Sequence, residues 1–115
     1  MCIRDSESSD RDKKENFEEV DCEEVLNQIA ALPISTWNYK TDDDQIRHIG
    51  PMAQDFKSAF DFGDSDKTIA MTDKAGISLA AIKALNAKLN GKDKEIEALN
   101  ERLEKLEALL TDRLK

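Results

Sequence analysis

The last third of the chain repeats apolar residues with a seven-residue period. From about Ser78 to Leu114, they recur at two positions of each heptad, which we call a and d. This pattern predicts one long helix whose apolar seam packs against other helices in a coiled coil. The predicted seam residues are Ile82, Leu89, Ile96, Leu103 and Leu110 at position a, and Leu85, Leu99 and Leu106 at position d.

Two polar residues, Lys92 and Arg113, interrupt position d. The neighbouring Asn90-Gly91 lowers helix propensity by about 1 kcal/mol, so we expect the seam to loosen at this point. In a parallel arrangement, Lys88 faces Asp93 and Arg102 faces Glu107 of a neighbouring helix, and both pairs are attractive. The charges therefore favour parallel helices, whereas the mixed Ile and Leu at position a do not select two strands over three.

The preceding part of the chain shows two shorter helical patterns. Asp21 begins the first as an N-cap followed by an acid three residues on, and Pro33 ends it. Gly50-Pro51 opens the second, because proline suits the first helical position. The apolar faces of these predicted helices comprise Val25, Leu26, Ile29 and Leu32 in the first, and Met52, Phe56 and Phe60 in the second.

Strand patterns surround the second helix. Residues 34–40 are rich in β-branched and aromatic side chains and predict a strand that contributes Trp37 and Tyr39 to the core. Residues 45–49 predict a return strand after a turn at 41–44, and residues 67–72 predict a third short strand. Residues 61–66 read as a polar loop and residues 73–76 as a turn.

These patterns predict an α+β fold: a small mixed head with short strands and two short helices, followed by a long C-terminal coiled-coil helix. We divide the chain into residues 1–8 as a leader or remnant of a parent protein, 9–77 as the head and 78–115 as the coiled-coil helix. A head of about seventy residues folds alone only marginally, so we expect the chain to associate with copies of itself.

Composition narrows the class of partner. The 115 residues are 39% apolar and 37% charged, with a net charge of −8. Basic residues are interspersed with acidic ones, which argues against nucleic acid or an anionic membrane as the main partner. No apolar run is long enough for a membrane span, and residues 1–10 lack the core of a signal peptide, so we expect a soluble product made in a cytoplasm.

Two cysteines, Cys2 and Cys22, have no metal-ligand spacing and predict neither a disulfide framework nor a metal site. We expect no cofactor. Residues 1–6 show no periodicity, and we interpret them as the product of a truncated reading frame standing where a longer parent belongs. A genuine start codon with promoter signals upstream of Ser6 would contradict this.

Two motifs carry the candidate chemistry. The first runs Ser9-Asp10-Arg11, then Lys14 and Phe17. The second is the cluster at 47–54, Arg-His-Ile-Gly-Pro-Met-Ala-Gln. Together with the heptads, they resemble the peptidase S74 family, the intramolecular chaperone and auto-processing domain at the C-terminal end of phage tailspikes, tail fibres and endosialidases. The resemblance extends from about Ser9 into the last heptads.

The resemblance implies that Ser9 is a nucleophile and Lys14 its base, and that the bond between Ser8 and Ser9 is cut. A serine hydroxyl reaches the preceding carbonyl carbon through a five-membered ring, so no substrate has to diffuse in. A lysine serves as base only where burial or nearby positive charge favours its neutral form. His48, the only histidine, is either a site residue that orients this pair or holds a trimer interface, or a strand-end imidazole satisfied by the backbone.

The function implied is a C-terminal intramolecular chaperone that drives trimerisation of a phage tail fibre or tailspike and then releases itself as a single-turnover serine endopeptidase. Its partners would be two further copies and the upstream parent, in the host cytoplasm during assembly, with the parent destined for the virion tail. The alternative is a non-cleaving module that trimerises and caps a fibre. A regulator that binds DNA after release from a membrane is disfavoured, because no basic recognition helix is present.

Overall fold

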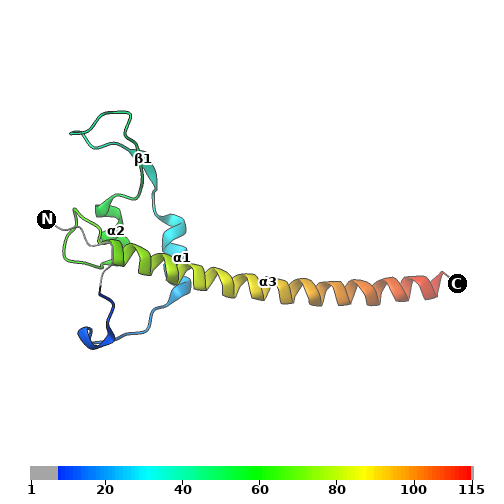
Figure 1. Cartoon of the computed structure of the whole chain (residues 1–115). Coiled ribbons are helices and arrows are strands. Elements are labelled where there is room, and N and C mark those ends of the chain that lie inside the picture. The colour runs from blue at the N-terminus through cyan, green and yellow to red at the C-terminus, as the bar shows by residue number, and fades with distance from the viewer. Residues whose placement is uncertain (1–7, 115) are drawn as a thin grey trace.

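A single long helix organises the molecule. The computed structural model describes residues 8–114, and in it helix α3, Met71–Arg113, runs from the head to the C-terminal end. The other elements gather around its first turns (Figure 1). The principal extents are 81 × 43 × 26 Å, so most of α3 projects beyond the head. The α+β class is confirmed, and the leader at residues 1–6, Cys2 included, lies outside the described residues.

The head contributes five short elements before α3. A 3₁₀ turn, η1, spans Arg11–Lys13, and helix α1 spans Cys22–Ala31. Strands β1, Ser35–Trp37, and β2, His48–Gly50, form an antiparallel hairpin, and helix α2 spans Ala53–Phe60. No helix among residues 8–114 combines the length and apolar character needed to cross a membrane.

Helix α3 starts seven residues before the predicted Ser78. The third strand expected at 67–72 and the turn expected at 73–76 are wrong, because residues 67–70 are irregular and the helix begins at Met71. The reason is tertiary: Ile77 and Ala81 extend an apolar helical face into the head, and packing of this face outweighs the weak helix propensity of Thr72 and Gly76. Asn90-Gly91 does not break the helix.

The core of the head is small and lies between α1, α2 and α3. It comprises Val25, Phe56, Ile77 and Ala81, each at most 8% exposed. The predicted α1 face is confirmed, because its remaining members pack around this core, as does the α2 residue Phe60. Asp21 caps α1 through its side chain, which accepts from the Glu24 N–H at 3.2 Å, and the helix ends before Pro33 as predicted.

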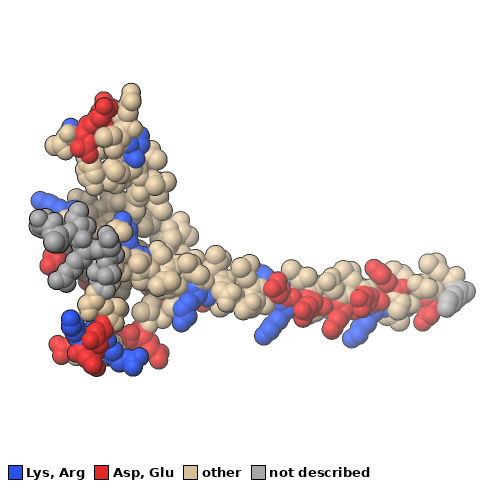
Figure 2. Space-filling model, viewed as in Figure 1, with Lys and Arg blue, Asp and Glu red and all other residues tan. Residues whose placement is uncertain are grey.

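Helix α3 has two apolar faces that diverge by about 100°, the angle between consecutive helical residues. Ala81 and Ala84 are buried in the head, and each is followed immediately by a seam residue, Ile82 and Leu85. The head therefore packs beside the seam without covering it. All eight predicted seam residues are exposed by 49% to 61%. Figure 2 shows charged side chains gathered along one edge of α3.

The hairpin is shorter than predicted and projects away from the core (Figure 1). Trp37 pairs with His48, and the Arg47 guanidinium donates to Asn38 Oδ1 at 2.9 Å and to Thr36 Oγ1 at 3.1 Å. The prediction that Trp37 and Tyr39 belong to the core is wrong: Tyr39 is 53% exposed. Their rings instead meet edge to face on the hairpin, with centroids 4.9 Å apart.

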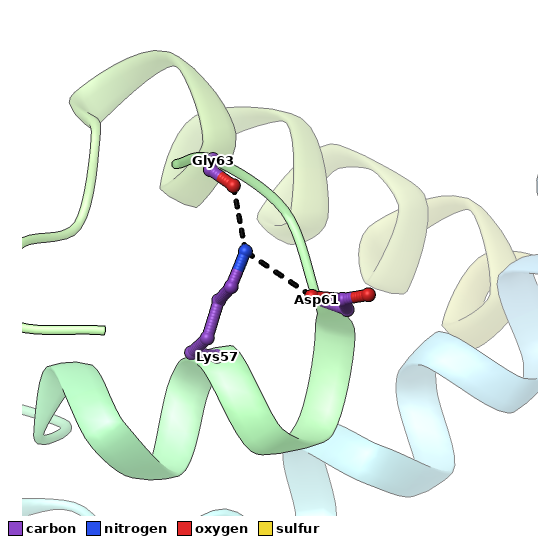
Figure 3. A network of polar contacts seen from close by, with 3 residues as sticks. All are labelled: Lys57, Asp61 and Gly63. Carbon is purple, nitrogen blue, oxygen red and sulfur yellow. Dashed lines mark hydrogen bonds and ion pairs between the residues drawn. The ribbon is translucent and has the colours of Figure 1, made fainter. Parts of the chain in front are cut away.

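Helix α2 starts at Ala53, two residues after Pro51, with Met52 as its N-cap, so the predicted proline at the first helical position is wrong. The helix ends at Phe60, and its C-cap, Asp61, adopts a left-handed conformation (φ 54°). Figure 3 shows that Lys57 links the end of α2 to the loop that follows it. The Lys57 Nζ lies 3.1 Å from Asp61 Oδ1 and donates to the Gly63 carbonyl at 2.6 Å. The loop is thereby held against α2.

Two glycines give stability predictions of opposite sign. A Cβ at Gly91 in α3 meets nothing within 4 Å, so Gly91→Ala should raise the free energy of unfolding by about 1 kcal/mol through helix propensity. At Gly63, φ is +82° and a Cβ would lie 3.3 Å from Asp73 Oδ2, so Gly63→Ala should be destabilising. Urea unfolding followed by circular dichroism at one fixed protein concentration measures both changes. A lower free energy of unfolding for Gly91→Ala would contradict the placement of Gly91 at an open position within helix α3.

Candidate active site

The turn η1 is built by Asp10. The Asp10 carboxylate accepts from the Asp12 N–H at 2.9 Å, and its carbonyl accepts from the Lys13 N–H at 3.1 Å. The next N–H, of Lys14, bonds to the Arg11 carbonyl at 3.1 Å. Aspartate favours such turns because its short side chain reaches the backbone two residues on. The chain thus folds back on itself directly after Ser9.

This reversal brings Ser9 and Lys14 together. The Lys14 Nζ donates to Ser9 Oγ at 2.7 Å, within the range expected for a nucleophile and its base. Both side chains are exposed in the single chain. The two residues predicted as a dyad are therefore in hydrogen-bond contact, while their catalytic roles stay a prediction.

His48 lies elsewhere in the single chain. It sits on β2, exposed, with its ring centroid 5.1 Å from that of Trp37 and 5.3 Å from that of Tyr39. Figure 1 shows the hairpin and η1 on opposite sides of α3. One copy of the chain therefore does not bring His48 to Ser9 and Lys14, and its role as a site residue stays a prediction.

A groove of about 580 Å³ lies at the base of the hairpin. Trp37, Gln54 and Lys74 contribute to its wall, and neither Ser9 nor Lys14 lines it. The Trp37 Nε1 is buried without a hydrogen-bond partner among residues 8–114. This groove is separate from the Ser9–Lys14 pair.

Charge near η1 is mixed. Arg11 and Lys13 flank the pair together with Asp12 and Glu15, and Figure 2 shows basic and acidic side chains side by side there. Within the part of the chain that the structure describes, no three His, Cys, Asp or Glu side chains group closely enough to hold a metal ion. The two groups in contact at this site are the Ser9 hydroxyl and the Lys14 amine.

Sequence reasoning missed the structural role of Asp10. The motif included this residue, yet only the structure identifies it as the cap of η1. The signal was present, since aspartate two residues before an N–H that it can bind is typical of an Asx turn.

A comparison with protein-family models finds one match on residues 9–63, to Peptidase_S74, described as chaperone of endosialidase. The match supports the resemblance to the Peptidase_S74 family over residues 9–63. The match starts at Ser9 and includes η1, α1, the hairpin and α2, so the Ser9–Lys14 pair lies at its first turn. The family description supports an intramolecular chaperone role and a peptidase-related one. A search of curated proteins finds no match.

Replacing Asp10 should separate the pair. Asp10→Ala removes the capping acceptor, at a cost of about 1 kcal/mol, so the population in which Lys14 reaches Ser9 should fall about fivefold. Asp10→Asn keeps an acceptor oxygen and should preserve it. Nuclear Overhauser contacts between the Lys14 ε-methylene and the Ser9 β-methylene measure this population; undiminished contacts in Asp10→Ala would show that the cap does not position the pair.

Proposed function

We propose that this chain is a C-terminal intramolecular chaperone that assembles three copies of a phage tail fibre or tailspike parent and then releases itself by cutting the bond between Ser8 and Ser9. The observation that carries the proposal is the 2.7 Å contact from Lys14 Nζ to Ser9 Oγ at the first residue of the family match. The exposed seam of α3 supports association with further copies.

The cut needs only groups on this chain and water. Ser9 Oγ attacks the Ser8 carbonyl carbon while its proton passes to Lys14 Nζ. The carbon–nitrogen bond then breaks, the Ser9 nitrogen takes up a proton as an amine, and Ser8 is left as an ester on Oγ. Water hydrolyses this ester, which frees the Ser8 carboxyl and restores the Ser9 hydroxyl.

Assembly of the three heads would create the conditions in which Lys14 acts as a base. In a single chain the exposed Lys14 Nζ donates to Ser9 Oγ, whereas a base must accept the hydroxyl proton. Neighbouring heads that cover η1 would exclude water and favour the neutral amine. In the same assembly His48, which is exposed on β2 of the single chain, serves the trimer interface.

Release of the chaperone would make folding of the parent irreversible in practice. The helices of three copies align, the heads organise the preceding parent segments, and the cut then detaches the helper. The chaperone lowers the barrier between the unfolded and the folded parent. Once it has been cut off, the folded parent faces the full barrier to unfolding. Assembly takes place in the host cytoplasm, and the parent is destined for the virion tail.

Mass spectrometry of the full chain tests the cut. Wild type should lose residues 1–8 and show a new N-terminus at Ser9, whereas Ser9→Ala and Lys14→Met should stay whole because each lacks one partner of the pair. Lys105→Met, at an exposed position of α3 outside the seam, is the matched control and should split like wild type. Splitting of Lys14→Met at the wild-type rate would refute the role of Lys14.

The same experiment distinguishes the self-cleaving chaperone from a second candidate function, a module that trimerises and caps a fibre without cutting itself. Both Ser9 and Lys14 are exposed in the single chain, which is what a non-cleaving trimerisation and capping module would also present. An intact wild-type chain that nevertheless forms trimers would establish that alternative.

Cleavage should depend on assembly, and the seam offers a clean test. Leu103→Asp places a charge on the seam, far from Ser9, and should slow cleavage at least tenfold by preventing assembly. Glu104→Ala alters the adjacent residue outside the seam and should leave the rate unchanged. Both positions are exposed in a single chain, so equal rates would show that cleavage needs no oligomer. First-order cleavage in a sample shown to be monomeric would show the same.

A further inference from the structure

Lys92 occupies a seam position that is otherwise apolar. Leu85 lies seven residues before it and Leu99 seven residues after, both at position d. In the single chain Lys92 lies on the surface, with its side chain 70% exposed and its Nζ 3.5 Å from Glu95 Oε2. Such an exposed ion pair contributes little, and burial of position d in a coiled coil would require the amine to find a closer partner.

Asp93 is the acid placed to meet it. In a parallel coiled coil, the hole that receives a position-d side chain includes position e of the neighbouring helix, and Asp93 occupies position e. Consecutive residues of one helix point about 100° apart, so Lys92 and Asp93 of the same chain do not face each other. A Lys92–Asp93 contact must therefore join two chains.

Lys88 is the competitor for this acid, since the sequence pairs it with Asp93 across helices. The structure gives Lys88 a different partner: its Nζ lies 3.8 Å from Glu23 Oε1 on α1 of the same chain. Lys88 thus lies beside α1 in the single chain, and we assign Asp93 to Lys92 of a neighbour.

We propose that Lys92 of each copy and Asp93 of its neighbour form a ring of ion pairs across the middle of the coiled coil, fixing the helices parallel and in register. The proposal rests on the trimer of the proposed function. A buried polar layer lowers stability but excludes shifted and antiparallel arrangements, in which these charges would be unpaired. Parallel register is what places all heads at one end.

Charge reversal on the full chain tests the ring, with the trimer dissociation measured by sedimentation over a concentration series. Lys92→Glu and Asp93→Lys should each raise the dissociation midpoint at least about tenfold, and the double variant should return it to within about threefold of wild type. Since the two residues do not touch within one helix, this rescue reports a contact between chains. Circular dichroism of each variant confirms that α3 remains folded.

The control variant restores the Lys92–Glu95 ion pair within one chain, with its charges exchanged. Lys92→Glu combined with Glu95→Lys restores only the pair between residues three apart on the same helix, and it should not recover assembly. Rescue by Glu95→Lys but not by Asp93→Lys in a trimeric wild type would overturn the ion-pair ring while leaving the trimer intact. No effect of Lys92→Glu would do the same, whereas a wild type that is monomeric throughout would overturn both.

Discussion

The packing of α1 against the face of α3 that contains Ala81 and Ala84 determines the rest of the structure. Small side chains let α1 approach closely, and Val25 fills the space between the helices. Because each alanine is followed directly by a seam residue, this contact orients the head about 100° from the coiled-coil stripe. One helix can thus hold its own head and still leave its predicted seam exposed.

The head that results is marginal by itself. Its buried core contains one large aromatic residue, Phe56, and no side chain in the described chain is fully buried. Exposed apolar residues in the head, among them Phe17 and Ile49, add to the exposed seam. In the proposed trimer, association would supply further burial and would cover η1, where Ser9 and Lys14 meet. Stability and the proposed chemistry therefore depend on one event.

Much of this arrangement could be predicted from local pattern. The long C-terminal helix, the Asp21 cap and the stop before Pro33 follow from local sequence pattern, and each was confirmed. The start of α3 was missed because burial against the head, rather than propensity, extends the helix back to Met71. The exposed Tyr39 was placed in the core because its β-branched and aromatic surroundings are typical of buried strands, and pattern alone does not reveal that the hairpin projects from the head.

The pairing of Ser9 with Lys14 was anticipated from motif order, whereas its cause, the Asp10 cap, is a matter of backbone geometry. What remains decisive is whether the free face of α3 meets copies of itself. Light scattering of the full chain in solution tests this most directly. The account predicts a mass of about 39 kDa, three times the 13.0 kDa of one chain, less three leaders where cleavage has occurred and they have dissociated. A mass of 13 kDa at all concentrations would contradict it.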